Sequence, residues 1–199
     1  MVSSRENAFL DLIVTRRSAS MLGEPGPSDA ELAQLLAAAV TVPDHGQLRP
    51  FRFAVVSGEG RSRFGAALAA AALERKPELN EHALENIRGK ALRSPTLIVL
   101  IASPKTAKIE LWEQNATAAC TGYAIVLAAH ALGIGAVWKS VPFTRGASLA
   151  ELFSLGSTEE LIGWIHLGTA IHTAPPREPF DVSSITTVID GGRPRPFRA

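Results

Sequence analysis

Three short segments of the sequence combine residue types that could bind a small polar ligand. The first is Arg16, Arg17 and Ser18, at the end of a predicted helix. Two guanidiniums beside a hydroxyl suit a phosphate group, because arginine donates through a two-pronged fork and serine adds a neutral donor. Arginines at a helix C-terminus also interact favourably with the helix dipole, so the triplet by itself leaves both roles open.

The second segment, 43–53, joins a predicted helix to a predicted strand, and ligand-binding loops are common at such junctions. Within it, His45 and Gln47 could hydrogen-bond the polar edge of a ring or a row of hydroxyl groups, with Phe51 and Phe53 behind them. A surface turn with solvated side chains is the alternative.

The third segment is Trp138, Lys139 and Ser140, which follows a glycine-containing break at 133–135. A lysine that closes an apolar strand beside a tryptophan is unusual, because a strand end inside a compact domain is partly shielded from water. The alternative is a lysine whose ammonium group reaches solvent at the rim of the protein.

Other kinds of site find little support. The five histidines are scattered without the spacing of metal ligands, so we expect no metal. The sequence has neither a Gly-x-Ser-x-Gly elbow nor a Gly-x-Gly-x-x-Gly turn between a strand and a helix, which argues against a serine nucleophile of that class and a dinucleotide-binding fold. The net charge of +1 gives no broad field for nucleic acid or an anionic membrane.

The elements that must position these segments alternate along the chain. A capping box at Ser28 and Glu31 opens a helix that Pro43 stops. Strands of four to seven residues separated by helices predict an α+β or α/β sandwich around one sheet. We expect further helices at 6–17, 61–75, 78–92, 109–132 and 148–155, and strands at 51–56, 96–102, 135–139 and 161–167.

We expect one domain over 1–199, irregular from about 171, in which the portion 181–189 could still pair as an edge strand. The apolar stretch 116–138 is the one candidate for a membrane span. It carries threonines, a histidine and a glycine break, so we expect a helix buried on all sides in a soluble protein. The single cysteine, Cys120, and an N-terminus without a long apolar core favour the cytoplasm.

The order of these signals is more specific than any one of them. An N-terminal helix ending in Arg-Arg-Ser, a proline–aromatic segment, a long apolar helix, Gly-x-Gly-x-x-Trp and a late strand ending in Leu-Gly-Thr together resemble the nitroreductase family. The similarity spans residues 7 to about 170. It is greatest to the small bacterial branch with Arg-Arg-Ser-x-Ser and Ala-Pro-Asp-His motifs.

The resemblance implies an α+β, three-layer sandwich with an antiparallel-rich central sheet, and an entwined homodimer with one flavin mononucleotide (FMN) per subunit in each interface cleft. Arg16, Arg17 and Ser18 would hold the phosphate and ribityl chain. Thr41 and His45 would reach the same flavin from the partner subunit, with Gln47 a weaker candidate. The third segment, Trp138, Lys139 and Ser140, would run along the isoalloxazine ring.

The implied activity is transfer of hydride from NAD(P)H through the flavin to nitroaromatics, quinones or related acceptors, in two half-reactions of a ping-pong cycle. Larger nitroreductases carry a lysine where this chain has Ser20, so we expect Lys139 to be the catalytic cation instead. The branch commonly has arginine at Thr41, and the larger enzymes have tryptophan at Phe51. Acceptor identity and the choice between NADH and NADPH therefore do not transfer.

Two other functions stay open from the sequence. An FMN-binding protein that sequesters or senses the flavin would carry the same clamp and turn over slowly. A purely structural α/β domain would be colourless when purified.

Overall fold

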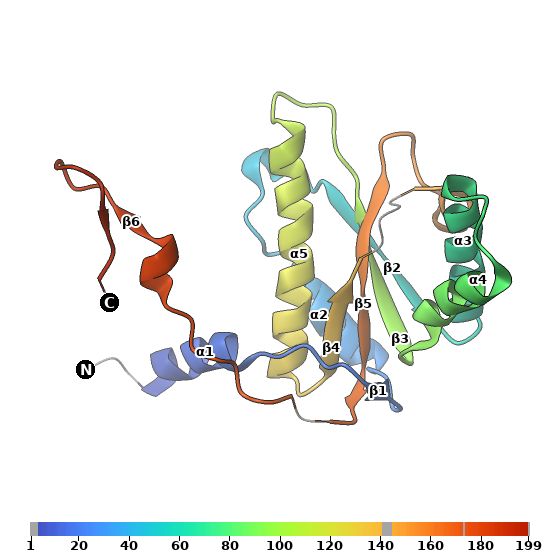
Figure 1. Cartoon of the computed structure of the whole chain (residues 1–199), viewed down its shortest axis with the longest axis horizontal. Helices are drawn as coiled ribbons and strands as arrows, with labels where there is room; N and C mark the ends of the chain where they lie inside the picture. Colours follow the sequence, from blue (N-terminus) through green and yellow to red (C-terminus); the bar gives the residue numbers. More distant parts are fainter. Residues whose placement is uncertain (1–3, 141–144, 173, 199) are drawn as a thin grey trace.

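The computed structural model describes residues 4–140, 145–172 and 174–198. One sheet lies between two layers of helices. A C-terminal arm, of which the structure describes residues 174–198, extends away from this body beside α1 (Figure 1). The strands are β1 (Leu22–Gly23), β2 (Phe51–Ser57), β3 (Thr96–Ala102), β4 (Gly135–Lys139), β5 (Glu160–Ala170), β6 (Thr187–Val188) and β7 (Arg195–Pro196). The α-helices are α1 (Ser4–Thr15), α2 (Asp29–Ala39), α3 (Gly60–Arg75), α4 (Glu81–Arg88), α5 (Leu111–Ala131) and α6 (Ala147–Phe153).

The long strand β5 organises the sheet. It pairs with β1, β3 and β4, while β2 pairs with the other edge of β3, and every one of these pairings is antiparallel. All seven residues of β3 are buried, because helices cover both faces of the sheet at this strand. The α+β class, the antiparallel-rich sheet and the three layers are thereby confirmed.

Each face of the sheet carries its own apolar core. On one face, α3 and α6 pack over Leu97, Val99 and Trp164. On the other, α2 and α5 pack over Ile98 and Leu100. Neighbouring β3 residues thus serve opposite cores, as the two-residue period of a strand requires.

The predicted start of α2 is confirmed in detail. The Ser28 hydroxyl accepts a hydrogen bond from the Glu31 amide at 3.3 Å, and the Glu31 carboxylate accepts one from the Ser28 amide at 2.7 Å. This reciprocal pair fixes the point at which the chain turns from β1 into the helix.

Several predicted boundaries are wrong. The first helix ends at Thr15, so Arg16 and Arg17 lie beyond it. Strand β1 is not among the expected strands, and it extends the sheet by pairing with Thr169 and Ala170 of β5. The portion 181–189 forms a 3-10 turn and strand β6, which pairs with β7 in a separate hairpin and not with the main sheet.

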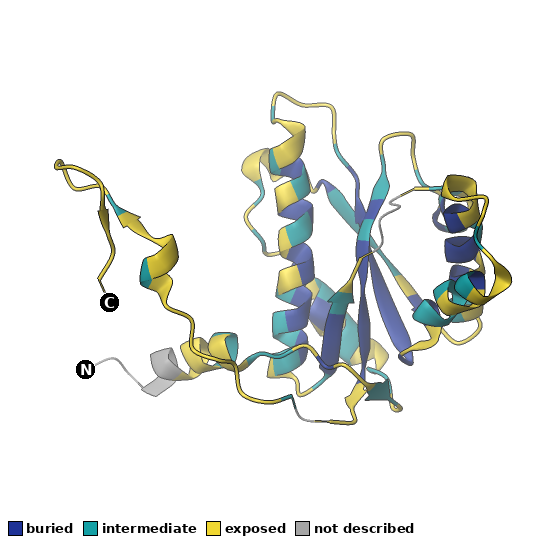
Figure 2. Cartoon of the chain, in the orientation of Figure 1, coloured by how far each residue is buried: buried dark blue, intermediate teal, exposed yellow. Residues whose placement is uncertain are grey.

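The expectation that the long helix is buried on all sides is also wrong for the single chain. In α5, Leu111, Trp112 and Tyr123 are exposed, the indole to 70%. Figure 2 shows exposed stretches on α5, and shows the C-terminal arm as almost wholly exposed. No helix in the described part of the chain combines the length and apolar character needed to cross a membrane.

Candidate functional site

The Arg16–Ser18 segment leads to the beginning of β4. The amide of Ala19 donates a hydrogen bond to the carbonyl of Ala136 at 3.0 Å, which ties the segment to the beginning of that strand. The C-terminal arm returns to the same place. The Arg17 guanidinium donates to the carbonyl of Pro175, and the Arg177 guanidinium donates to the carbonyl of Arg16 at 3.1 Å.

A pocket of about 350 Å³ opens beside this segment. Arg17 and Ser18 line it on one side, and the turn from α5 into β4 closes another. Two histidines that the sequence analysis did not single out, His130 at the end of α5 and His172 after β5, also line it. Arg16 is not among the lining residues, although it is next in the chain.

The third predicted segment lies at the far end of the same strand. Lys139 is three residues beyond Ala136, a distance of about 10 Å along an extended strand. Its register partner on β5 is Trp164, so Lys139 lies on the α3 side of the sheet. Trp138 faces α5 instead, and a Cβ built on Gly122 would lie 2.7 Å from its ring. The alternation of a strand thus separates the two side chains.

Thr41, His45 and Gln47 lie elsewhere, in the turn that follows α2. The Thr41 hydroxyl donates to the carbonyl of Ala38 at 2.8 Å, and its side chain is exposed. The His45 Nδ1 atom lies 2.6 Å from Oε1 of Glu113 in the first turn of α5. Gln47 is exposed and has a φ of 53°, a left-handed conformation that a tight turn imposes on it.

The sequence analysis missed two polar residues in the first turns of α5, of which Glu113 contacts the turn after α2 and Gln114 holds the loop before α5. Besides Glu113, the buried Gln114 accepts from the Lys105 amide at 2.8 Å and donates to the carbonyls of Lys105 and Ile109 at 3.1 and 3.0 Å. These bonds fold the loop before α5 onto the helix. The adjacent Glu113 and Gln114 near the start of a mostly apolar helix are the signal that could have indicated them.

One chain does not bring the two groups of predicted residues together. The Thr15 hydroxyl contacts His130 at one end of α5, at 3.2 Å, and His45 contacts Glu113 at the other end. At 1.5 Å per residue, Glu113 and His130 are about 26 Å apart along the helix axis. Figure 1 shows α1 at the foot of α5 and the turn after α2 beside its top.

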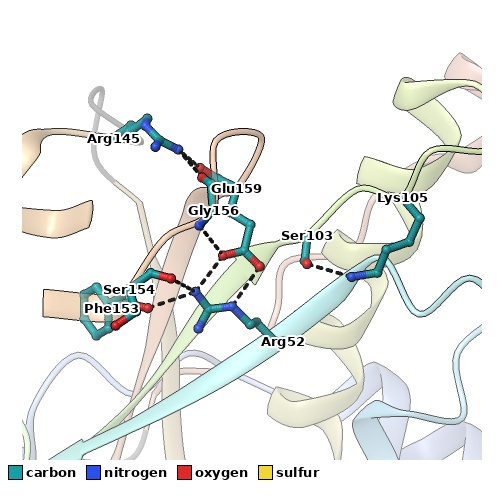
Figure 3. A network of polar contacts seen from close by, with 8 residues as sticks. All are labelled: Arg52, Ser103, Lys105, Arg145, Phe153, Ser154, Gly156 and Glu159. Carbon is teal, nitrogen blue, oxygen red and sulfur yellow. Dashed lines mark hydrogen bonds and ion pairs between the residues drawn. The ribbon is translucent and has the colours of Figure 1, made fainter. Parts of the chain in front are cut away.

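A network of charged groups at the upper end of the sheet is structural. Arg52 of β2 donates to both carboxylate oxygens of Glu159, at 2.8 and 2.7 Å, and also to the carbonyl of Phe153 (Figure 3). Arg145 donates to the carbonyls of Gly156 and Glu159. The Arg52 guanidinium lowers the pKa of Glu159 to about 2, so this carboxylate stays ionised and cannot act as a proton donor near neutral pH.

His166 of β5 belongs to a second buried network. The indole Nε1–H of Trp164 donates to His166 Nε2 at 2.8 Å, and His166 Nδ1 lies 2.8 Å from the hydroxyl of Ser94. That hydroxyl donates to the carbonyl of Thr96 at 3.0 Å, so Nδ1 carries the hydrogen and the ring is neutral. Burial lowers the pKa of His166 to about 4, with smaller contributions from the charges of Arg93 and Lys139.

Known proteins match both the sequence and the fold. The profile of the Nitroreductase family matches residues 13–169. "Putative NAD(P)H nitroreductase YdjA" of Escherichia coli K12 is 35% identical over 161 residues, which is 80% of this chain and 87% of that protein.

Among solved structures, the nitroreductase-like family protein of Bacillus cereus superposes with a TM-score of 0.78 at 21% identity, over 92% of this chain and 96% of that one. A nitroreductase with bound FMN from Desulfitobacterium hafniense gives a TM-score of 0.65 at 21% identity, over 91% and 98% of the two chains. The profile covers well over half of the sequence, and a relative above 30% identity spans most of it. This chain therefore belongs to the nitroreductase family.

Proposed function

We propose that the protein is an FMN-dependent oxidoreductase that takes hydride from NAD(P)H and passes it to nitroaromatic, quinone or related acceptors. The family supports oxidoreductase activity. The name of the Escherichia coli relative supports NAD(P)H as donor, and the bound FMN of the Desulfitobacterium hafniense protein supports this flavin. FMN supplies the hydride-accepting ring that no amino-acid side chain provides.

The donor set beside β4 fits FMN. Arg17 and Ser18 line a pocket suited to a phosphate, and the edge of β4 runs from there to Lys139 over about 10 Å. A flavin extended along this edge would have its phosphate at one end of the strand and its ring at the other. The clamp at the phosphate end favours FMN over FAD, because the chain has no glycine turn for a second phosphate.

The observation that carries the proposal is the separation of the two residue groups along α5. Arg16–Ser18 follow Thr15, which contacts His130 at one end of this helix, while His45 contacts Glu113 at the other end. Glu113 and His130 are about 26 Å apart along the helix axis. That span is longer than one FMN molecule. Both groups can contact the same flavin only if each is supplied by a different chain, so we infer a homodimer with two equivalent sites.

Surface features of the single chain agree with a homodimer. The exposed side of α5 carries Leu111, Trp112 and Tyr123, which a partner subunit would cover. The β6–β7 hairpin has two-residue strands and no core of its own, and an isolated hairpin of this kind is marginally stable in water. Ile185 and Ile189 on this arm are 74% and 77% exposed. A second copy of the chain would bury both surfaces.

Lys139 is the proposed catalytic cation. Lys139 is exposed at the last position of β4. If the flavin ring lies at this end of the strand, a fixed positive charge there would stabilise the negative charge that the ring gains on reduction. Trp138, half-buried against α5, would support the strand from behind, and Ser140 follows at the rim. Donor and acceptor would use the same ring in turn, as a ping-pong cycle requires.

The test is the visible absorption spectrum of the purified protein, followed by an assay of NADH and NADPH oxidation with a quinone and a nitroaromatic. Flavin released by heat should be FMN, and turnover should need an acceptor. A colourless protein that binds no added FMN would contradict the proposal. Tight FMN binding without turnover would favour a flavin-sequestering protein instead.

A further inference from the structure

The pocket beside the Arg17–Ser18 segment contains two histidines from separate elements. His130 is half-buried in the last turn of α5, and His172 is exposed just after β5. Both line the same pocket of about 350 Å³ as Arg17 and Ser18. The sequence separates these residues widely, and only the fold brings them together.

The charged groups at this pocket favour an anion. Among the described residues that line it, the charged or titratable side chains are Arg17, His130 and His172, and none is a carboxylate. In α1, the Thr15 hydroxyl donates a hydrogen bond to the backbone carbonyl of Asp11 at 2.6 Å, and not to its carboxylate. From the C-terminal arm, Arg177 adds a guanidinium bound to the carbonyl of Arg16. The lining turn at 133–136 contributes no charged side chain.

The hydrogen bonds of His130 identify the atom that can gain a proton. The Thr15 hydroxyl donates its hydrogen to the carbonyl of Asp11, so it accepts from His130 Nε2–H at 3.2 Å. In the neutral ring Nδ1 is therefore the unprotonated nitrogen. A phosphate in the pocket would favour proton uptake there, because an anion stabilises a neighbouring imidazolium.

We propose that His130 and His172 belong to the FMN phosphate site, together with Arg17 and Ser18, and make the retention of FMN depend on pH. This inference rests on the proposed function. A protonated imidazole is a cation and a charged donor to the phosphate. Affinity for FMN should then increase as the pH falls, whereas affinity for riboflavin, which lacks the phosphate, should not.

The experiment measures FMN dissociation constants by quenching of flavin fluorescence, with apoprotein at pH values between 8.5 and 6. The proteins are the wild type, His130→Gln, His172→Gln, the double variant, and His82→Gln as a control on the exposed surface of α4. The FMN phosphate itself gains a proton near pH 6. The decisive quantity is therefore the ratio of the double-variant to the wild-type dissociation constant at each pH.

We expect this ratio to rise by about tenfold or more from pH 8.5 to pH 6, as one or two charged hydrogen bonds would produce. Each single variant should give part of the rise, His82→Gln none, and riboflavin titrations should give a constant ratio. Circular dichroism checks that the variants are folded. If the ratio for FMN stays constant while the wild type binds FMN, the role of the two histidines is overturned and the proposed function is not. A wild type that binds no FMN overturns the proposed function as well.

Discussion

Replacing Arg17 by alanine probes the phosphate end of the proposed flavin site. The Arg17 guanidinium lines the pocket and donates to the carbonyl of Pro175, so it is already oriented by the C-terminal arm. A hydrogen bond to a charged group contributes about 1.5–3 kcal/mol, which corresponds to a loss of FMN affinity of roughly 10- to 150-fold. Arg16, which does not line the pocket, should give a smaller loss when replaced by alanine.

The assay is a fluorescence titration of apoprotein with FMN and, separately, with riboflavin. Arg17→Lys should recover only part of the affinity, because an ammonium group cannot reproduce the two-pronged geometry. Turnover should largely return at saturating FMN, since the phosphate is far from the hydride-accepting ring. Arg63→Ala, on the exposed surface of α3, is the matched control. Equal FMN affinities of Arg17→Ala and wild type, or equal losses for FMN and riboflavin, would refute the reasoning.

Three further substitutions test other parts of the molecule. Lys139→Ala should lower the midpoint potential of the bound flavin and slow reduction by NAD(P)H, because a cation near the ring is lost; an unchanged potential would count against this assignment. Glu159→Gln should reduce the free energy of unfolding in urea by about 1–2 kcal/mol at pH 7, after allowance for solvent screening of the Arg52 pair. The pKa of Glu159 is lowered from 4.5 to about 2, so this stabilisation is present above pH 4.5 and lost as the pH falls toward 2; a difference that stays constant over this window would contradict it. The pKa of His166 is lowered from 6.5 to about 4, so the neutral ring contributes stability above pH 6.5 that is lost as the pH falls toward 4. His166→Gln should be less stable than wild type at pH 7 and should lack this loss of up to about 3 kcal/mol. Unfolding monitored by tryptophan fluorescence measures both proteins; parallel curves of stability against pH would show that the histidine does not titrate there.

Local sequence patterns predicted two kinds of feature: an element whose residues are all buried, and a helix start that is fixed by neighbouring residues. The bounds of β3 follow from an unbroken apolar run, because every one of its residues is buried. The start of α2 follows from Ser28 and Glu31, whose reciprocal hydrogen bonds involve only neighbouring residues.

Features that depend on distant parts of the chain could not be predicted in this way. Strand β1 has two residues, Leu22 and Gly23, and exists because β5 offers a partner beyond Gly168. The exposed side of α5 has an apolar composition that cannot distinguish burial within one chain from burial between two.

The same distinction between local and distant features applies to the candidate site. The Arg16–Ser18 triplet and the 138–140 segment were proposed from residue type, and the bond between Ala19 and Ala136 places the triplet beside the start of the strand that ends at Lys139. The pocket histidines and the bond between His45 and Glu113 were missed, because each joins residues remote in sequence. A scattered histidine has no local pattern that would distinguish it from a solvated one.

The central claim, that each flavin is held by two chains, has a direct test by complementation. One chain carries Arg16→Ala and Arg17→Ala, the other carries Thr41→Ala and His45→Ala, and the two are co-expressed with different affinity tags. Each variant alone should bind FMN weakly.

In the mixed dimer, one of the two sites combines intact Arg16 and Arg17 from one chain with intact Thr41 and His45 from the other. The account predicts that the doubly tagged dimer, purified on both tags, binds about one FMN per dimer with wild-type affinity. The other site carries all four substitutions and stays empty. If each flavin were held within a single chain, the mixed dimer would bind FMN no more tightly than its parents, and that result would contradict the account.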